Sequence, residues 1–206
     1  MLQNDPELFE LSMSEKTQPL MDLVKKHCEE NIKPIQQEYS ALQNEKEDRW
    51  SWHPRQIELM EGAKEKAREL GLWNFFLPDP DGNIGDGLTN LDYTYVASEI
   101  GKYPLASESM NCSAPDTGNM EVLERVGTEE QKKQWLEPLL NGEIRSAYAM
   151  TEPNLASSDA KNISTSAVLD GDEWVINGEK FYISGAGDPR CKIMITMVKT
   201  SPCLLY

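Results

Sequence analysis

The spacing of hydrophobic residues changes near Arg145, and this change constrains the fold more than any other feature of the chain. Before it, apolar residues recur every three or four positions, which is the period of helices with one buried face. After it they alternate, which is the period of strands. The sequence therefore predicts an α+β fold: an all-helical amino-terminal domain over residues 1–145, followed by the start of an antiparallel β domain over residues 146–206.

Several helices are expected in the first part. A long one carries an apolar face and should kink at Pro34, which lacks a backbone donor; the face comprises Leu20, Val24, Cys28, Ile32, Ile35 and Tyr39. A second, over residues 54–70, carries the stripe Ile57, Met60, Ala63, Ala67 and Leu70. Thr89 should cap a third helix that ends at Gly101, and residues 116–126 should form a fourth. Thr128 and Gln131 form a capping box that opens the last helix.

The second part should be built of short strands. Strands are expected over residues 146–151, 163–169, 173–177, 179–184 and 192–198. Asp170-Gly171 and Asn177-Gly178 separate neighbouring segments, and both dipeptides favour tight hairpins because they tolerate positive φ.

The charge of the chain limits its partners. The sequence has 35 acidic and 20 basic residues and a net charge of −15, which argues against nucleic acid as the main partner. No run of about 18 apolar residues is present, so no membrane span is expected. The first ten residues lack a signal core, and the four cysteines are scattered. A cytoplasmic location with reduced thiols is expected, or an organelle matrix if a targeting segment is absent.

No metal site is expected. His27 and His53 lie in charged helical sequence and are interpreted as solvated, because no set of metal ligands surrounds them. In the loop over residues 78–87, side chains with ligand oxygens stand at every second position, as in a calcium loop: Asp79, Asp81 and Asn83. Ile84 occupies the position where that loop needs glycine, and Asn90 the position where it needs glutamate. The loop is therefore interpreted as a connector.

Two blocks in the second part combine residues that can bind a ligand. Residues 148–159 lead from a strand into Thr-Glu-Pro and then a loop of small, hydroxyl-bearing residues, which leaves backbone amides open to a planar or anionic ligand. Residues 177–186 place an aromatic and a hydroxyl side chain two positions apart. Taken singly, each block fits an ordinary surface loop or hairpin better than a binding site.

Together the two blocks resemble the acyl-CoA dehydrogenase family. Residues 148–159, with Glu152-Pro153 and Ser158-Asp159, resemble the first signature of that family, and residues 177–184 resemble its flavin-packing motif. Further similarities follow in the same order as in the family, at residues 30–34, 69–72, 114–121 and 127–133. The details are most similar to the branch that acts on long or unusual acyl chains.

The resemblance assigns roles to individual residues. Tyr148, Met150 and Thr151 would border the flavin ring of FAD, and Tyr182, Ile183 and Ser184 would pack against its other side. Ser157 and Ser158 would face the flavin pyrophosphate and the acyl-CoA, with Ser158 as the substrate contact. Tyr182 stands where the family usually has tryptophan.

The implied reaction is α,β-dehydrogenation of an acyl-CoA, with electrons passed to an electron-transfer flavoprotein by a homo-oligomeric enzyme. Family members are nearly twice as long, and their catalytic base lies in a later helical bundle. We therefore expect a truncated, inactive form with no catalytic residue, since none of the four candidates stands at the base position: Glu143, Glu152, Glu173 and Glu179. A non-catalytic interaction or assembly fragment is the alternative, as is an acyl-CoA oxidase or flavin monooxygenase on the same scaffold.

Overall fold

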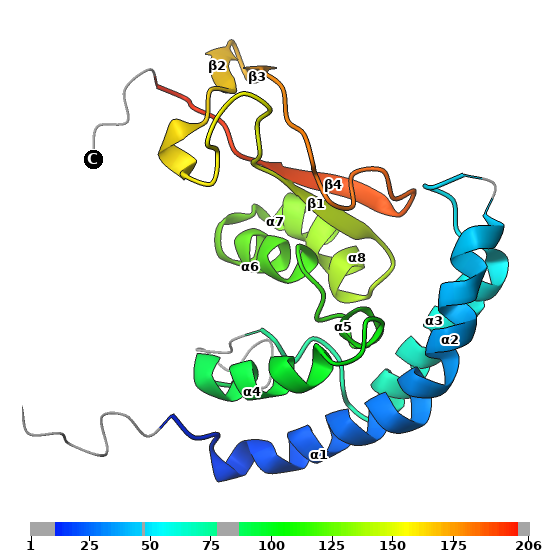
Figure 1. Ribbon diagram of the computed structural model, residues 1–206. Coiled ribbons are helices and arrows are strands. Elements are labelled where there is room, and N and C mark those ends of the chain that lie inside the picture. Colours follow the sequence, from blue (N-terminus) through cyan, green and yellow to red (C-terminus); the bar gives the residue numbers. More distant parts are fainter. Residues whose placement is uncertain (1–10, 47, 78–86, 202–206) are drawn as a thin grey trace, which may run out of the picture. The chain divides into compact units, whose positions relative to one another are not determined.

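The chain folds into two compact units, residues 1–117 and 118–206. The computed structural model describes residues 11–46, 48–77 and 87–201. The first unit is helical, and the second combines helices with two small sheets (Figure 1). The predicted order, helices followed by a sheet-bearing part, is confirmed. The connector interpreted at residues 78–86 lies outside the described residues.

The described part of the helical unit contains five α-helices. They are α1 (Gln18–His27), α2 (Lys33–Ala41), α3 (Pro54–Glu69), α4 (Asn90–Ile100) and α5 (Ala106–Ser109). Thr89 caps α4 as predicted, because its side chain accepts the backbone N–H of Asp92. The four-residue α5 was not predicted, since it is too short to show a period.

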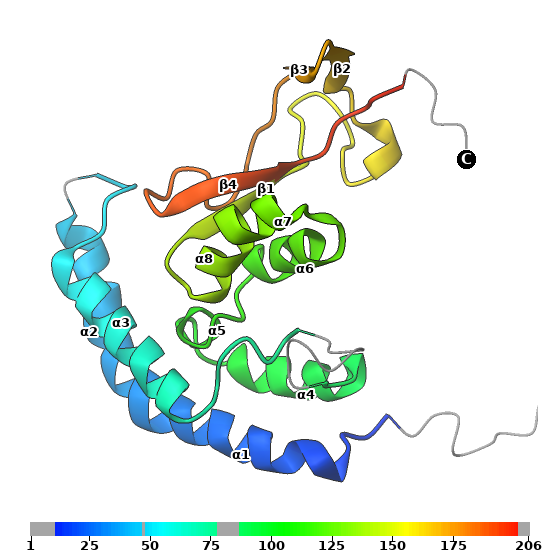
Figure 2. The same ribbon diagram turned by 180° about the vertical axis from the view of Figure 1, so that it is seen from behind.

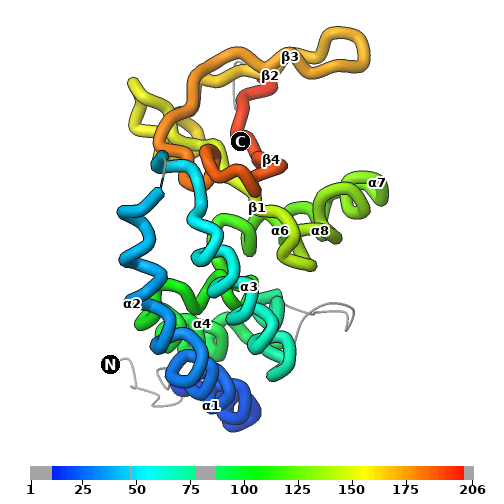
Figure 3. Tube along the Cα trace, turned by 90° about the vertical axis from the view of Figure 1, so that its right-hand side faces the viewer, coloured from blue at the N-terminus to red at the C-terminus, as the bar shows by residue number. Residues whose placement is uncertain are grey.

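Helices α1 and α2 form one long, bent helix, as Pro34 led us to expect (Figures 1 and 3). A π-helical segment, Cys28–Ile32, joins them, and the N–H of Lys33 bonds to the carbonyl of Cys28. The wider turn comes immediately before Pro34, which has no N–H and whose ring crowds the preceding turn. The bend is thus absorbed by one widened turn without a break in the helix.

The core of the helical unit follows the predicted apolar faces with one exception. Val24, Cys28 and Ile32 are fully buried, and α3 packs against α2 and α5. Ile57 was predicted to be part of the buried stripe of α3, but it is 50% exposed, and Leu59 is buried instead. Leu59 joins Met60 and Tyr39 in a buried cluster, because the face of α3 that meets α2 is rotated from the face its spacing favoured.

His27 was interpreted as solvated, and that interpretation is wrong. Its side chain is fully buried, and Nε2 lies 3.0 Å from the Ser109 hydroxyl on α5. Ser109 Oγ donates to the carbonyl of Ala106, so it accepts from Nε2–H, while Asn31 donates to Nδ1. The surrounding sequence is charged on the other helix faces, and this hid the buried position.

The second unit places helices against one face of a two-stranded sheet. The helices are α6 (Asp116–Val126), α7 (Glu129–Gln131) and α8 (Glu137–Leu140), with the predicted capping box at Thr128 and Gln131. Figures 1 and 2 show these helices on the same side of strands β1 (Arg145–Ala149) and β4 (Cys191–Thr196). Asn119 on α6 fixes the contact, because its amide donates to Ser146 Oγ and to the Ala147 carbonyl.

The two sheets differ in direction. Strands β2 (Ser166–Asp170) and β3 (Glu173–Asn177) pair antiparallel around Asp170-Gly171, as predicted. Strands β1 and β4 pair in parallel, which corrects the expectation of antiparallel pairing throughout. A parallel pair needs a connection of about a dozen residues or more, and the long segment between β1 and β4 provides one.

The strand expected over residues 179–184 is absent from the described structure. The Lys180 side chain turns inward to bond the carbonyl of Met150, and Tyr182 adopts φ 55°. Positive φ interrupts the extended backbone that a strand needs. The segment is therefore a loop, although its sequence alternates as in a strand.

Candidate functional site

The two sequence blocks lie side by side in the second unit. The N–H of Phe181 donates to the carbonyl of Thr151 over 3.0 Å. Thr151 follows the end of β1, and Tyr182 follows Phe181 in the chain. Because one backbone hydrogen bond joins the blocks, the hydroxyl of Thr151 and the ring of Tyr182 belong to the same small region.

A buried ion pair lies beneath this region. Lys180 Nζ donates to Glu152 Oε1 over 2.8 Å and to the Met150 carbonyl over 2.9 Å. The Glu152 side chain is only 2% exposed, and that of Lys180 is 11% exposed. Both residues therefore serve as internal anchors that join the two blocks, and neither is a surface charge.

Glu152 receives three further hydrogen bonds from the segment before β2. Ser164 donates both its N–H and its hydroxyl to Oε2, each over 2.7 Å, and the N–H of Thr165 donates to Oε1 over 2.9 Å. Burial alone would raise the pKa of the Glu152 carboxyl, but the hydrogen bonds from Lys180, Ser164 and Thr165 outweigh it and hold that pKa well below its usual range. The carboxylate is therefore charged and fully engaged, and it is not available as a catalytic base.

The predicted residues of the first block differ in exposure. Tyr148 is 38% exposed on β1, Thr151 and Ser158 are exposed, and Met150 is half-buried. Ser157 is buried, and its hydroxyl accepts the N–H of Glu152 over 2.9 Å. The structure thus leaves Thr151 and Ser158 open to a ligand and gives the Ser157 hydroxyl an internal partner.

The predicted residues of the second block are mostly open. Tyr182 is 84% exposed, and its ring centroid lies 4.1 Å from that of Phe181. Ile183 is half-buried, and Ser184 is exposed. A non-glycine residue at φ 55° is unfavourable, so the surrounding contacts must hold Tyr182 in place.

These side chains fit one side of a flavin. A large aromatic ring that is 84% exposed offers a flat apolar surface, and the exposed Thr151 hydroxyl offers a hydrogen bond to the polar edge of such a ring. Gly178 keeps the loop close to β2, because a Cβ there would lie 2.4 Å from Thr165 Oγ1. The chemistry of the open residues is therefore compatible with a flavin.

Sequence reasoning did not identify the residues that organise this site. Lys180 was included only as a motif position, Glu152 only as a motif position and a rejected base candidate, and Ser164 and Thr165 had no assigned role. The available signals were a lysine in a turn-forming Asn-Gly-Glu-Lys segment and a glutamate just after a strand. Spacing alone could not pair them, because 28 residues separate them.

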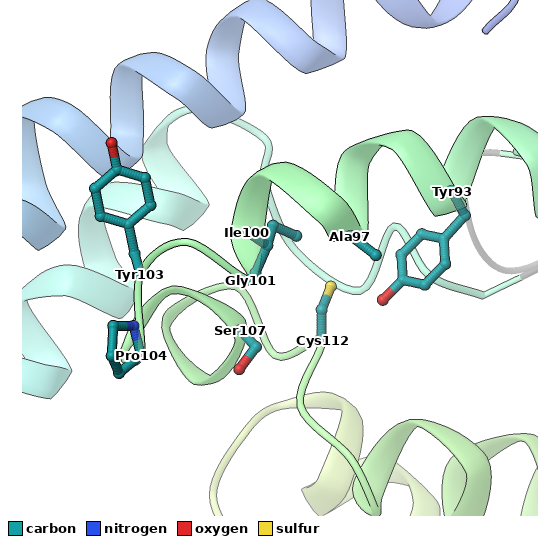
Figure 4. Close-up of a pocket in the computed structure, with 8 residues that line it drawn as sticks. All are labelled: Tyr93, Ala97, Ile100, Gly101, Tyr103, Pro104, Ser107 and Cys112. Carbon is teal, nitrogen blue, oxygen red and sulfur yellow. The ribbon is translucent and has the colours of Figure 1, made fainter. Parts of the chain in front are cut away.

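A separate cavity of about 320 Å³ lies in the helical unit (Figure 4). Figure 4 shows the Cys112 thiol on one wall, pointing toward α4. The remaining lining residues are mostly aromatic or aliphatic: Tyr93, Ala97, Ile100, Gly101, Tyr103, Pro104 and Ser107. None of the motif residues lines it, so this cavity and the motif region are two distinct features.

Within the described ranges, no group of three or more His, Cys, Asp and Glu residues could hold a metal ion. The cysteines of the described part are free thiols, with Cys28 and Cys112 buried and Cys191 half-buried. No helix in that part is long and apolar enough to cross a membrane.

Comparison with protein families agrees with the fold and the motifs. The family model "Acyl-CoA dehydrogenase, N-terminal domain" matches residues 14–143, and "Acyl-CoA dehydrogenase, middle domain" matches residues 147–203. The chain belongs to the acyl-CoA dehydrogenase family. The resemblance seen in the two sequence blocks is thereby confirmed at the level of the family.

Relatives of this acyl-CoA dehydrogenase family chain share up to about half of its residues. Mouse acyl-CoA dehydrogenase family member 10 is 48% identical over 193 residues, covering 92% of this chain and 18% of that protein. A probable acyl-CoA dehydrogenase of Mycobacterium tuberculosis is 54% identical over 145 residues, covering 70% of this chain and 34% of that protein. The chain therefore spans about a fifth to a third of the length of these curated relatives.

Solved structures show the same fold. A putative acyl-CoA dehydrogenase from Mycobacterium abscessus superposes with a TM-score of 0.80 at 42% identity, over 90% of this chain and 46% of that one. A glutaryl-CoA dehydrogenase from Mycobacterium smegmatis, in complex with FADH2, has a TM-score of 0.57 at 24% identity, over 86% and 42% of the two chains. The second likeness extends to the fold alone.

Proposed function

We propose that this chain forms one side of the FAD site of an acyl-CoA dehydrogenase, an enzyme that introduces an α,β double bond into an acyl-CoA thioester. The observation that carries the proposal is the joined pair of blocks, in which Phe181 bonds Thr151 and leaves Tyr182 open. Family membership and the FADH2 complex of a protein with the same fold support it.

Each residue assigned from the two blocks has a role in this proposal. FAD, when bound, supplies the acceptor for the hydride that leaves the substrate. Thr151 would donate its hydroxyl to the polar edge of the flavin ring, and Tyr182, Ile183 and Ser184 would pack against the ring and shield it from water. Tyr148 and Met150 would border the ring, and Ser157 and Ser158 would face the pyrophosphate and the acyl-CoA.

The proposal names no catalytic base. Glu152, the most buried carboxylate of the site, is held charged by four hydrogen bonds. We infer that proton removal depends on a residue outside this chain, and that electron-transfer flavoprotein and further subunits are partners of the whole enzyme. The 206-residue chain alone is expected to show no dehydrogenation with an artificial electron acceptor. Turnover above a flavin-only blank that Thr151→Ala abolishes would contradict this expectation.

Titration of the chain with FAD, followed by the visible absorbance of the flavin, tests the proposal. Thr151→Ala and Tyr182→Ala should each weaken binding by about threefold to tenfold, since each removes one contact. Thr200→Ala replaces an exposed threonine outside both blocks and should leave binding unchanged. A wild-type chain that leaves the flavin spectrum unchanged would overturn the proposed FAD site.

A non-catalytic role in assembly is the second candidate. The β2–β3 ribbon exposes five large apolar side chains, each at least 53% accessible: Val168, Leu169, Trp174, Val175 and Ile176. Exposed apolar patches of this kind mark interaction surfaces. A chain that binds no FAD but forms a stoichiometric complex lost on Trp174→Lys would favour this second function.

A further inference from the structure

The contacts of the ion pair between Glu152 and Lys180 indicate a role in addition to stabilising the fold. Lys180 bridges two places in the first block, the Met150 carbonyl before Thr151 and the Glu152 carboxylate after it. The ammonium group therefore bonds the residues on both sides of Thr151. The next residue, Phe181, bonds the carbonyl of Thr151 itself.

The same contacts determine the position of Tyr182. Tyr182 is two residues from Lys180 and has φ 55°, a left-handed conformation that is unfavourable for a tyrosine. Its ring is 84% exposed and contacts that of Phe181, so its own burial contributes little to holding this conformation. The restraint comes from the anchored segment before it, which Lys180 and Phe181 fix to the first block.

From this geometry we infer that Glu152 and Lys180 are a positioning pair for the flavin-facing side chains of Thr151 and Tyr182. The inference rests on the proposed FAD site and adds two residues to it. Neither side chain needs to touch the flavin, because Glu152 is buried and Lys180 is only 11% exposed, while Thr151 and Tyr182 are exposed. The pair acts by holding two open residues at one separation before a ligand arrives, which lowers the cost of ordering them on binding.

Lys180→Met, with Lys180→Arg as the conservative variant, separates this role from general stability. In the absence of FAD, hydrogen exchange at the Phe181 amide should be about tenfold or more faster in Lys180→Met, because the local anchor is lost while the helical unit is untouched. The dissociation constant for FAD should rise by about tenfold or more in the same variant, because the open residues lose their preset separation. Lys180→Arg keeps the charge and should restore both values to within about threefold of wild type.

Two further variants complete the experiment. Lys33→Met removes an exposed lysine whose partner is Glu29, and both readouts should stay at the wild-type value. If Lys180→Met does not fold, Glu152→Gln is used, because it nearly preserves the shape of the site while it removes the charge and replaces one acceptor oxygen with an amide NH2. Unchanged exchange at Phe181 together with unchanged FAD affinity in the folded variant would overturn the positioning role.

The two readouts also separate the inference from the function on which it rests. A wild-type chain that binds no FAD contradicts the proposed function, and the exchange measurement still decides whether the pair joins the blocks. Faster exchange at Phe181 with unaltered FAD affinity would mean that the pair is structural only, and this result overturns the inference.

Discussion

His27 in the helical unit and Glu152 in the sheet-bearing unit are both almost completely buried, yet His27 is neutral and Glu152 is charged. His27 has one hydroxyl and one amide as partners, and burial lowers its pKa to about 4, so it is neutral at pH 7. Glu152 has a lysine and three further donors, and it stays charged.

The difference shows that burial by itself does not decide ionisation. Desolvation disfavours the charged form of both groups, and it prevails at His27, whose ring bonds to the neutral side chains of Ser109 and Asn31. At Glu152, an opposite charge and directed N–H and O–H groups outweigh it. A histidine with neutral partners is suited to a packed helical core, whereas a charged anchor with donors from two segments is suited to fixing loops.

The largest effect is expected from removing the counter-charge of Glu152. Lys180→Met should lower the free energy of unfolding by about 3–5 kcal/mol, because it leaves a buried carboxylate without its cation. Urea denaturation measures this loss. Lys33→Met, at an exposed pair, should change stability little because solvent screens that pair. Equal effects of the two variants would mean that Glu152 is solvated, and the comparison would fail.

The pH dependence of stability should distinguish the two centres. Well above pH 6.5, His27 is neutral in both the folded and the unfolded chain. Between about pH 6.5 and 4 the unfolded chain binds a proton that the folded chain does not, so the free energy of unfolding should fall by about 3 kcal/mol across this window. Glu152, whose pKa is lowered, stabilises the fold above its ordinary value of 4.5, and that contribution should be lost only as the pH falls below it.

Urea denaturation at a series of pH values, compared between wild type and His27→Gln, isolates the histidine contribution. The variant should show a shallower decline between pH 6.5 and 4. His53→Gln provides the matched control, because His53 is the only other histidine of the chain. An identical decline in wild type and His27→Gln would show that His27 is not the group that titrates.

A smaller effect is expected at Ser109, the hydrogen-bond partner of His27. Ser109→Ala removes the acceptor of Nε2–H and leaves that group buried without its partner, which should cost about 1–3 kcal/mol. The free energy of unfolding from urea denaturation measures it. Ser40→Ala, at an exposed position on α2, is the control and should be close to neutral. No loss at Ser109 would mean that His27 finds another acceptor.

The smallest effect is expected at Ser164. Ser164→Ala deletes one of the two hydrogen bonds from this residue to Glu152 but keeps the backbone bond, so about 1 kcal/mol should be lost. The same urea assay applies, with Ser40→Ala again as the control. A loss as large as that of Lys180→Met would show that the hydroxyl, rather than the ammonium group, keeps Glu152 charged.

Local sequence patterns predicted most of the fold. Thr89 and Thr128 cap the helices that their spacing indicated, and Asp170-Gly171 makes the hairpin between β2 and β3. These features depend on residues within a few positions of one another, so the sequence contains them directly. The motif blocks likewise pointed to the family because they are contiguous.

The features that the sequence did not disclose depend on residues far apart in the chain. His27 meets Ser109 across 82 positions, Glu152 meets Lys180 across 28, and β1 pairs in parallel with β4 across a long connection. Sequence alone determined the longer helices, their caps and the turn at Asp170-Gly171, since these follow from local propensity and period. Only the tertiary structure decided which charged groups are buried and which blocks lie side by side. The energies of desolvation and ion pairing depend on the residues, distant in sequence, that folding brings around each group.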